Sequence, residues 1–191
     1  ERVGFHPRGG GKISAAFRPA PLRPIRRIER GERKIVTATV TISDNLPPHI
    51  LERAQSELES RAEKAGWPLR TVLLALPSYS PGMAVHLDAV YEGGAGGFTM
   101  LGRKGLSTER VVADAWSELH RFDETGATVD EHLADQLLLP ALFADGPSEY
   151  RTSRVTEHLR TMAWLVPQFG VGEVEIDETT GLVRVQPSNR S

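Results

Sequence analysis

The sequence predicts an α+β protein with a small α/β unit in its middle. Three observations carry this prediction. The 191 residues suffice for one or two small domains, and the 39% hydrophobic and 25% charged residues fit a globular chain. Residues 30–125 follow a β-α-β-β-β-α pattern, and the last segment, 172–187, alternates as a β-hairpin.

The first 28 residues predict one strand and a linker. Residues 11–18 alternate apolar and polar side chains, which indicates a strand. Residues 19–28 contain three prolines and three arginines, which is typical of a linker.

Residues 30–125 predict four strands and two helices. The strands share β-branched or alternating apolar side chains and cover 34–42, 71–76, 85–91 and 98–101. The first helix has apolar residues at helical spacing, Asp44 or Asn45 as its cap and Gly66 at its end. Ser107 or Thr108 is the predicted cap of the second helix.

The remaining residues predict two helices, a strand and the hairpin. Thr128 and Glu131 have the spacing of a capping box, which predicts a helix to about Ala144 with a kink at Pro140. The other predicted elements are a strand at 148–153, a helix at 157–169 and hairpin strands at 172–177 and 182–187.

Composition limits the chemistry that the chain can perform. The chain has no cysteine, which excludes disulfides, thiolate zinc sites and thiol nucleophiles. No apolar run approaches the roughly 18 residues of a membrane span, and no signal peptide is visible. We therefore expect a cytoplasmic protein, and because the first residue is Glu1 we expect a fragment or a processed product.

Charge is distributed unevenly along the chain. Residues 1–34 carry ten Lys/Arg against three Glu, although the whole chain has a net charge of only −2. A basic segment of this kind can attract phosphate backbones, and Arg26, Arg27, Arg30 and Arg33 are its candidate RNA contacts. A solvated basic linker beside an acidic body is the alternative.

His158 lies where the last predicted helix begins. A neutral imidazole is a nucleophile, and the start of a helix disfavours the imidazolium and favours a phosphate alongside. These properties suit attack on the α-phosphate of a nucleotide. A purely structural histidine is the alternative interpretation of this residue.

His132, Asp135 and Gln136 stand at i, i+3 and i+4, so they share one face of a helix. An imidazole ring can stack on a purine, a carboxylate can orient a histidine or a hydroxyl, and an amide can bind ribose. A polar face packed beside a loop is the alternative. Asp130 and Glu131 do not converge with His132 on one metal ion, because adjacent helical residues point in different directions.

Two glycine clusters complete the set of candidates. Gly9–Gly11 lets backbone amides approach a phosphate or a neighbouring strand closely. Gly93–Gly97 indicates a hairpin loop, because it lacks both the strand-to-helix context and the lysine of a P-loop.

Four segments, in this order, resemble the C-terminal half of RNA 3'-terminal phosphate cyclases. They are Gly-Phe-His-Pro-Arg-Gly-Gly-Gly at 4–11, Arg-Gly at 30–31, Asp-Glu-His-Leu-Ala-Asp-Gln at 130–136 and Thr-Glu-His-Leu-Arg-Thr at 156–161. The resemblance covers nearly the whole chain and is strongest at 4–11 and 129–161.

The resemblance implies a fold with two parts. Residues 1–28 and 126–191 would form the last βαβαββ-type repeat of a large domain, similar to the C-terminal domain of translation initiation factor 3. Residues 29–125 would form a small thioredoxin-like α/β insert domain, in which the absence of cysteine excludes thiol redox chemistry.

The resemblance also implies a ligase that processes RNA by nucleotidyl transfer. Such enzymes bind ATP and Mg2+ and convert an RNA 3'-terminal phosphate to a 2',3'-cyclic phosphate through a phosphohistidine bond to AMP. His158 would be the nucleophile, Asp135 would support it or the nucleotide, His132 would stack on adenine, and Gln136 would contact the nucleotide.

Two departures from the family pattern bear on this expectation. Met162 stands where the family usually has asparagine, and the N-terminal half with its Gly-Glu-Gly-Gly-Gly segment is absent. We therefore expect this chain alone to be inactive, with the missing half and RNA 3'-phosphate ends as its partners and no membrane. The alternative is a cyclase-like factor without catalysis that binds RNA during ribosome assembly.

Overall fold

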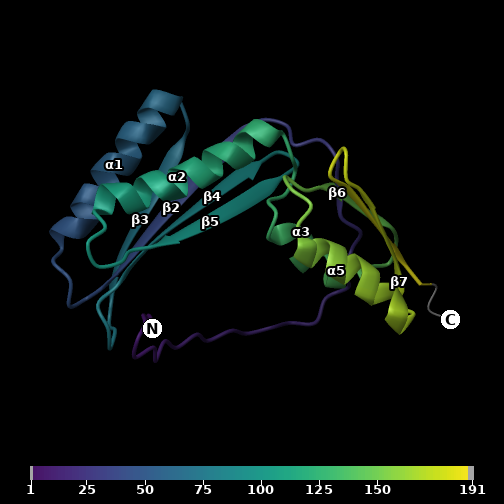
Figure 1. Ribbon diagram of the computed structural model, residues 1–191, viewed down its shortest axis with the longest axis horizontal. Coiled ribbons are helices and arrows are strands. Elements are labelled where there is room, and N and C mark those ends of the chain that lie inside the picture. The colour runs from purple at the N-terminus through teal and green to yellow at the C-terminus, as the bar shows by residue number, and fades with distance from the viewer. Residues whose placement is uncertain (1, 189–191) are drawn as a thin grey trace. The chain divides into compact units, whose positions relative to one another are not determined.

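The computed structural model describes residues 2–188, which divide into two compact units (Figure 1). Within the described residues, the first unit comprises 2–17, 33–90 and 97–121. The second comprises 18–32, 91–96 and 122–188. The structure thus groups residues 2–17 with 33–90, whereas the sequence predicts 1–28 together with 126–191. That domain assignment stays a prediction.

The first unit is built on a four-stranded sheet in the order β3-β2-β4-β5. Its strands are β2 (Arg33–Ser43), β3 (Leu69–Leu76), β4 (Met83–Tyr91) and β5 (Ala95–Leu101). β2 and β3 are parallel, with Val36 opposite Leu69. β4 is antiparallel to both of its neighbours, because Ser43 at the end of β2 bonds to Gly82 just before β4, and Gly102 after β5 bonds to Met83.

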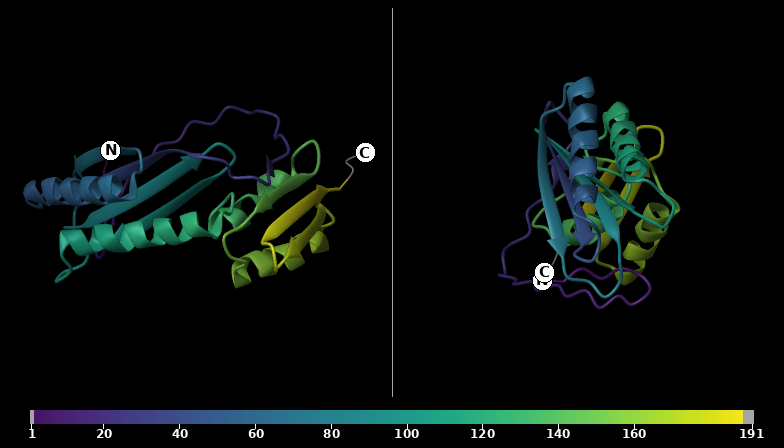
Figure 2. Two further views of the ribbon diagram at one scale, coloured as in Figure 1. Left: turned by 90° about the horizontal axis from the view of Figure 1, so that it is seen from above. Right: turned by 90° about the vertical axis from the view of Figure 1, so that its left-hand side faces the viewer.

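Two helices cover one face of this sheet (Figure 2). The helices are α1 (His49–Ala65) and α2 (Thr108–Thr125), and the side chains buried in β2 include Val36, Ala38 and Val40. The ion pair of Arg53 with Glu109 joins the two helices. The β-α-β-β-β-α order predicted for residues 30–125 is therefore confirmed.

Capping of these helices differs in part from the prediction. Ser107 accepts a hydrogen bond from Arg110 N at 3.2 Å, as predicted for the start of α2. α1 instead begins after Pro48, which has no capping side chain, and Gly66 ends it in the left-handed conformation. The predicted cap Asn45 accepts from the Ser43 hydroxyl at 2.7 Å, because the two prolines separate it from the helix.

The predicted strand at 11–18 is wrong. Among the described residues, only Lys12 of this segment forms a β-bridge, with Arg2. Ile13 and Phe17 are 94% and 90% exposed, so an alternating pattern without a neighbouring strand leaves both sides in solvent. The strand instead lies in the predicted linker, as β1 (Arg26–Arg27), which pairs in parallel with residues of the second unit.

The second unit contains a four-stranded sheet in the order β1-β6-β8-β7. The further strands are β6 (Ser148–Arg151), β7 (Gly172–Asp177) and β8 (Leu182–Pro187), and both hairpin strands have the predicted bounds. β8 is antiparallel to β6 and to β7. With the helices between them, the elements of this unit run in the order βαβαββ.

Helices pack on one face of this second sheet. They are α3 (Leu133–Gln136), α4 (Leu138–Leu142), α5 (Glu157–Leu165) and the short 3-10 helix η1 (Val166–Phe169). Leu138, Leu142, Tyr150 and Leu159 are among the side chains that form the core between helices and sheet. Among the described residues, no helix is long and apolar enough to cross a membrane.

The predicted start of the 128–144 helix at Thr128 is wrong, and the predicted kink at Pro140 takes the form of a break between two short helices. The helix divides into α3 and α4 at Leu137, because Pro140 has no N–H to donate to the carbonyl of Gln136. Thr128 is buried, and its hydroxyl donates to backbone carbonyls of Arg27 and Arg151 instead of capping a helix.

Candidate active site

Asp130 positions the start of α3. Its Oδ1 accepts hydrogen bonds from His132 N at 2.8 Å and from Leu133 N at 2.9 Å. Asp130 is only 4% exposed, and its carboxylate satisfies two backbone donors at the helix start. This cap fixes the backbone that carries His132 and Asp135.

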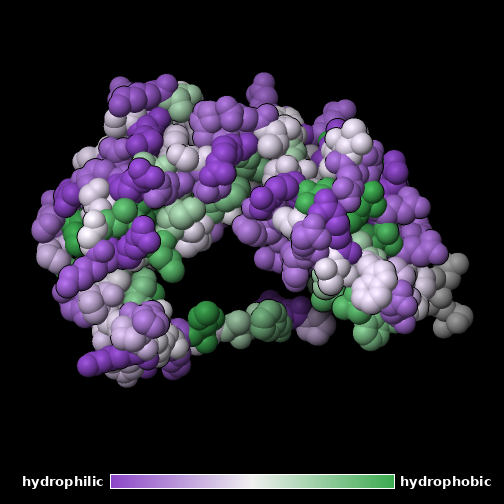
Figure 3. Space-filling model, in the orientation of Figure 1, coloured by the Kyte–Doolittle hydropathy of each residue, from purple (hydrophilic) through white to green (hydrophobic). Residues whose placement is uncertain are grey.

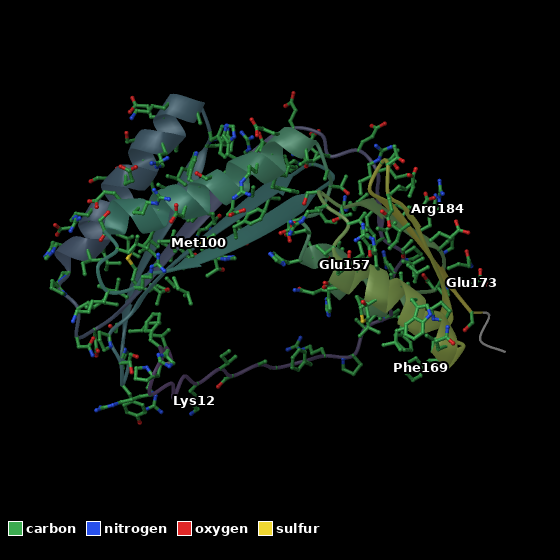
Figure 4. All side chains as sticks on the ribbon, in the orientation of Figure 1. Lys12, Met100, Glu157, Phe169, Glu173 and Arg184 are labelled. Carbon is green, nitrogen blue, oxygen red and sulfur yellow. The ribbon has the colours of Figure 1, made fainter. Side chains whose placement is uncertain are left out.

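Thr156 positions the start of α5. Its hydroxyl accepts from Leu159 N at 3.1 Å, and its backbone is extended, as expected of an N-cap. Glu157 and His158 are therefore the first two helical residues, and Figure 4 labels Glu157 at this helix start. The predicted start of this helix at about Glu157, which puts His158 in its first turn, is confirmed.

His158 and Asp135 meet across the two helices. His158 Nδ1 lies 2.5 Å from Asp135 Oδ2, and the side chains are 72% and 13% exposed respectively. An ionised carboxylate can only accept, so Nδ1 carries a proton and donates a hydrogen bond to Asp135. The lone pair is then on Nε2, at the other edge of an exposed ring.

Tyr150 supports the helix that carries Asp135. Its hydroxyl donates to the carbonyl of Ala134 at 2.6 Å, and the residue is fully buried beneath α3. Burial raises the pKa of the Tyr150 phenol above its usual value, and the nearby charge of Asp135 raises it further. Tyr150 is therefore a neutral hydrogen-bond donor that fixes the backbone next to Asp135.

Glu131 connects His132 to the loop before α5. Its carboxylate forms an ion pair with Arg154, and Oε1 lies 3.7 Å from His132 Nε2. The carboxyl groups of Asp130, Glu131 and Asp135 thus have three different sets of partners. No group of three His, Cys, Asp or Glu side chains within residues 2–188 is placed to hold a metal ion.

Gln136 and His132 remain open to solvent. The side chain of His132 is 68% exposed, and Gln136 is exposed and has no hydrogen bond to another described side chain. The structure therefore brings Asp135 and His158 into contact but does not bring His132 or Gln136 into contact with either. Both remain on the same short helical turn as Asp135.

Arg160 ties α5 to the β7–β8 turn. Its guanidinium donates to both carboxylate oxygens of Glu178, at 2.8 and 3.0 Å, and to Glu157 at 2.5 Å. The hydrogen bonds and charge of Arg160 lower the pKa of Glu178. This contact fixes the first turn of α5, which carries His158, relative to the sheet of the same unit.

Arg154, Tyr150 and Arg160 were not among the candidates from sequence analysis. The partners of Arg154 and Arg160 in the fold, Glu131 and Glu178, are 23 and 18 residues away in the sequence, so no local pattern predicts these two contacts. A tyrosine in a short alternating strand gives no sign that its hydroxyl reaches a helix. The one available signal was the cluster of charged residues on either side of His158.

Met162, the departure from the expected pattern, packs against the core of the second unit and is partly buried. Its side chain therefore contributes apolar contact at this position, where an asparagine would offer a polar amide. The adjacent Thr161 hydroxyl donates to the Glu157 carbonyl at 2.8 Å.

Comparison with known proteins links these features to a family. The sequence model of that family, described as RNA 3'-terminal phosphate cyclase, matches residues 1–176. An RNA 3'-terminal phosphate cyclase of Nostoc sp. is 37% identical over 186 residues, which is 97% of this chain and 53% of that protein. The proteins of the same name from Methylococcus capsulatus and Methanosarcina barkeri are 35% and 33% identical and are covered to 52% and 54% of their lengths.

The chain spans about half the length of the curated relatives that it matches. The residues matched by the family model, 1–176, include the positions of the His158–Asp135 pair and of Gly9–Gly11. The chain belongs to the RNA 3'-terminal phosphate cyclase family.

Proposed function

We propose that this chain is the nucleophile-bearing part of an ATP-dependent RNA 3'-terminal phosphate cyclase. The observation that carries the proposal is the contact between His158 Nδ1 and Asp135 Oδ2 at the start of α5, in a chain of this family. With its Nδ1–H directed at Asp135, the imidazole ring has its lone pair on the exposed Nε2, which is the tautomer of histidine that can attack phosphorus.

In the first step, His158 Nε2 attacks the α-phosphorus of ATP. A nitrogen–phosphorus bond forms, the bond from the α-phosphorus to the bridging oxygen breaks, and pyrophosphate leaves with the electron pair. No proton has to leave Nε2, because the proton is on Nδ1. Asp135 stabilises the positive charge that develops on the ring, as a buried carboxylate does beside other catalytic histidines.

The later steps return His158 to its starting form. An oxygen of the RNA 3'-phosphate attacks the phosphorus of AMP, and the nitrogen–phosphorus bond breaks. The vicinal 2'-hydroxyl then loses its proton to solvent as its oxygen bonds to the RNA phosphorus. The bond from that phosphorus to the oxygen that bridges to AMP breaks, and AMP leaves with the electron pair. The 2'-hydroxyl is held next to the phosphorus that it attacks, and this proximity favours ring closure. Activation by AMP also favours it, because AMP is a far better leaving group than a bare phosphate oxygen.

The described residues fit a nucleotide better than they fit a resident metal. His132 presents an exposed ring for stacking on adenine, and Gln136 presents an unpaired amide for ribose. Mg2+ is usually held by one or two carboxylates together with substrate phosphates, and it supplies neutralisation of phosphate charge. Asp135 is the acidic group that lies beside His158, and it is already hydrogen-bonded to that ring.

The fold supports the finer assignments that the resemblance implies. The βαβαββ order of the second unit supports a repeat like that of translation initiation factor 3. The sheet of the first unit has the strand order β3-β2-β4-β5, and its first two strands in the sequence, β2 and β3, are parallel. This arrangement supports a thioredoxin-like insert. We propose that residues 1–28 join 126–191 when the other half of a cyclase is present, in a cytoplasmic enzyme.

Labelling with ATP tests the proposed reaction. The complete protein that carries this sequence and its His158→Ala variant are incubated with α-labelled ATP and Mg2+. A phosphoramidate is acid-labile and base-stable, so the expected result is label with this stability on the unaltered protein and none on the variant. An unlabelled but folded complete protein would contradict the reaction and favour a factor that binds RNA without catalysis.

A further inference from the structure

A pocket of about 250 Å3 lies in the second unit at the end of β6. Its walls are the loop between β6 and α5, the turn between β7 and β8, and the residues that follow α2. Arg151, Arg154, Ser153 and Thr179 are the lining residues that bear on its chemistry. No part of the proposed reaction at His158 uses this pocket.

One of the two arginines that line the pocket, Arg151, has no acidic partner among the described residues. Within residues 2–188, Arg151 has no ion pair, and its Nε is buried without a hydrogen-bond partner. Arg154 is 68% exposed and pairs only with Glu131 on the active-site side. Glu178 is the acidic lining residue, but Arg160 binds both of its carboxylate oxygens.

The pocket also presents hydroxyl groups that are free to donate. Ser153 and Thr179 line it, and their hydroxyls have no hydrogen bond to another described residue. The hydroxyls of Thr152 and Thr180 are instead engaged, with the Arg154 carbonyl and with Asp177. Two arginines with two free hydroxyls are the donor types that bind phosphate oxygens in nucleic acids.

The pocket is close to the proposed nucleophile along the chain. Arg154 precedes His158 by four residues, which limits the distance between their Cα atoms to about 14 Å. Glu131 contacts Arg154 on one side and His132 on the other, so the pocket and the proposed nucleotide site share one carboxylate. A strand that ends at His158 can therefore reach Arg151 or Arg154 within a short run of nucleotides.

We propose that this pocket binds a backbone phosphate of the RNA strand, upstream of the 3'-phosphate that reacts at His158. This inference rests on the proposed function, because it places the pocket on the path of the RNA. A mononucleotide bound at His158 is too short to reach the pocket, whereas a longer strand can reach it. The affinity of the protein for RNA should therefore depend on the length of the strand. Recognition through a phosphate is independent of base sequence.

Binding of RNA strands of increasing length tests this inference. Fluorescence anisotropy is measured with oligoribonucleotides that end in a 3'-phosphate, using the complete protein and its Arg151→Gln variant. The variant is expected to bind a strand of several nucleotides about tenfold more weakly, since it loses charge-assisted hydrogen bonds. The slope of the logarithm of the binding constant against the logarithm of the salt concentration is expected to become shallower by about 0.7. This is the contribution of one phosphate contact with a single strand.

A second variant guards against misfolding. Thr179→Glu changes an exposed turn residue and places a negative charge beside the pocket. It is therefore expected to weaken the binding of long RNA strands as Arg151→Gln does. Arg110→Gln is the matched control, because Arg110 pairs with Asp114 on α2, outside the pocket. The inference is overturned if Arg151→Gln and Thr179→Glu bind long strands as the unaltered protein does, or lose equal affinity for mononucleotide and strand.

The two proposals fail in different assays. Labelling by ATP requires no RNA, so an absence of label rejects the reaction at His158 whatever the anisotropy shows. Normal labelling together with unchanged RNA affinity in both pocket variants rejects the phosphate pocket alone.

Discussion

Asp135 Oδ2 lies 2.5 Å from Nδ1 of His158, although 23 residues separate the two in the sequence. The caps formed by Asp130 and Thr156 bring the first turns of α3 and α5 to this contact. Asp135 is mostly covered and His158 is mostly exposed, so the carboxylate belongs to the scaffold and the ring faces the solvent. This division suits a nucleophile that must be held at one nitrogen and free at the other.

Asp135→Asn tests whether the carboxylate orients the histidine. An asparagine side chain keeps the shape but loses the negative charge and can present its amide N–H to Nδ1, which favours the wrong tautomer. We expect the single-turnover rate of adenylylation to fall about 100-fold or more, with little change in the affinity for ATP. The rate is measured by rapid quench with labelled ATP.

Asp135→Glu is the companion to that variant because it keeps the charge. Partial recovery of the rate with a shifted pH profile is expected. An unaltered rate in Asp135→Asn would show that Asp135 is a structural residue only.

His132→Ala tests the predicted stacking position. Because the side chain is 68% exposed and contacts only Glu131, its removal should leave the fold intact. We expect ATP to bind about tenfold more weakly, within the range of base stacking on a side chain, and His132→Phe to retain affinity. Equilibrium binding of a non-hydrolysable ATP analogue checks this, and equal affinity in all three proteins would reject adenine stacking on His132.

The sequence predicted most elements whose signals are local. The hairpin 172–177 and 182–187 has the bounds expected from its alternation, and Gly181 at its turn has φ +67°. The strands and helices of 30–125 follow for the same reason. Strand β1 was missed because a two-residue strand has no period, and its pairing partner β6 is more than a hundred residues away.

Burial explains why the cap predicted at Thr128 was wrong. Thr128 has the spacing of a cap, but it is fully buried between backbone carbonyls, and Asp130 caps the helix instead. Spacing placed His132, Asp135 and Gln136 on one helix face, and the family resemblance implied the role of each. The resemblance implied that Asp135 supports the histidine or the nucleotide, and the structure has the contact with the histidine. The catalytic roles of these residues stay predictions.

Asp130→Ala tests the importance of the α3 cap. The variant removes the buried carboxylate that accepts from the N–H groups of His132 and Leu133. Loss of an N-cap typically costs about 1–2 kcal/mol of the free energy of unfolding. Urea unfolding at neutral pH measures this cost, and Asp130→Asn should lose much less because its side-chain oxygen still accepts. A cost below about 0.3 kcal/mol for Asp130→Ala would mean that the two bonds do not hold α3.

Glu109→Gln tests the contact between α1 and α2 through its dependence on pH. Arg53 donates to both oxygens of Glu109 at 2.7 Å. This hydrogen bonding lowers the pKa of Glu109 from 4.5 to about 2. A carboxyl group with a lowered pKa in the folded state stabilises the fold above its unfolded pKa, and that stabilisation is lost as the pH falls through the folded value.

We therefore expect the melting temperature of Glu109→Gln to lie slightly below that of the unaltered protein at pH 7. The difference should shrink as the pH falls from 4.5 toward 2. It should also shrink with added salt, since both side chains are more than 40% exposed. Arg110→Gln is the control, because its partner Asp114 lies on the same helix and does not join α1 to α2. A difference between Glu109→Gln and the unaltered protein that stays constant down to pH 2 would show that packing, and not the ion pair, joins these helices.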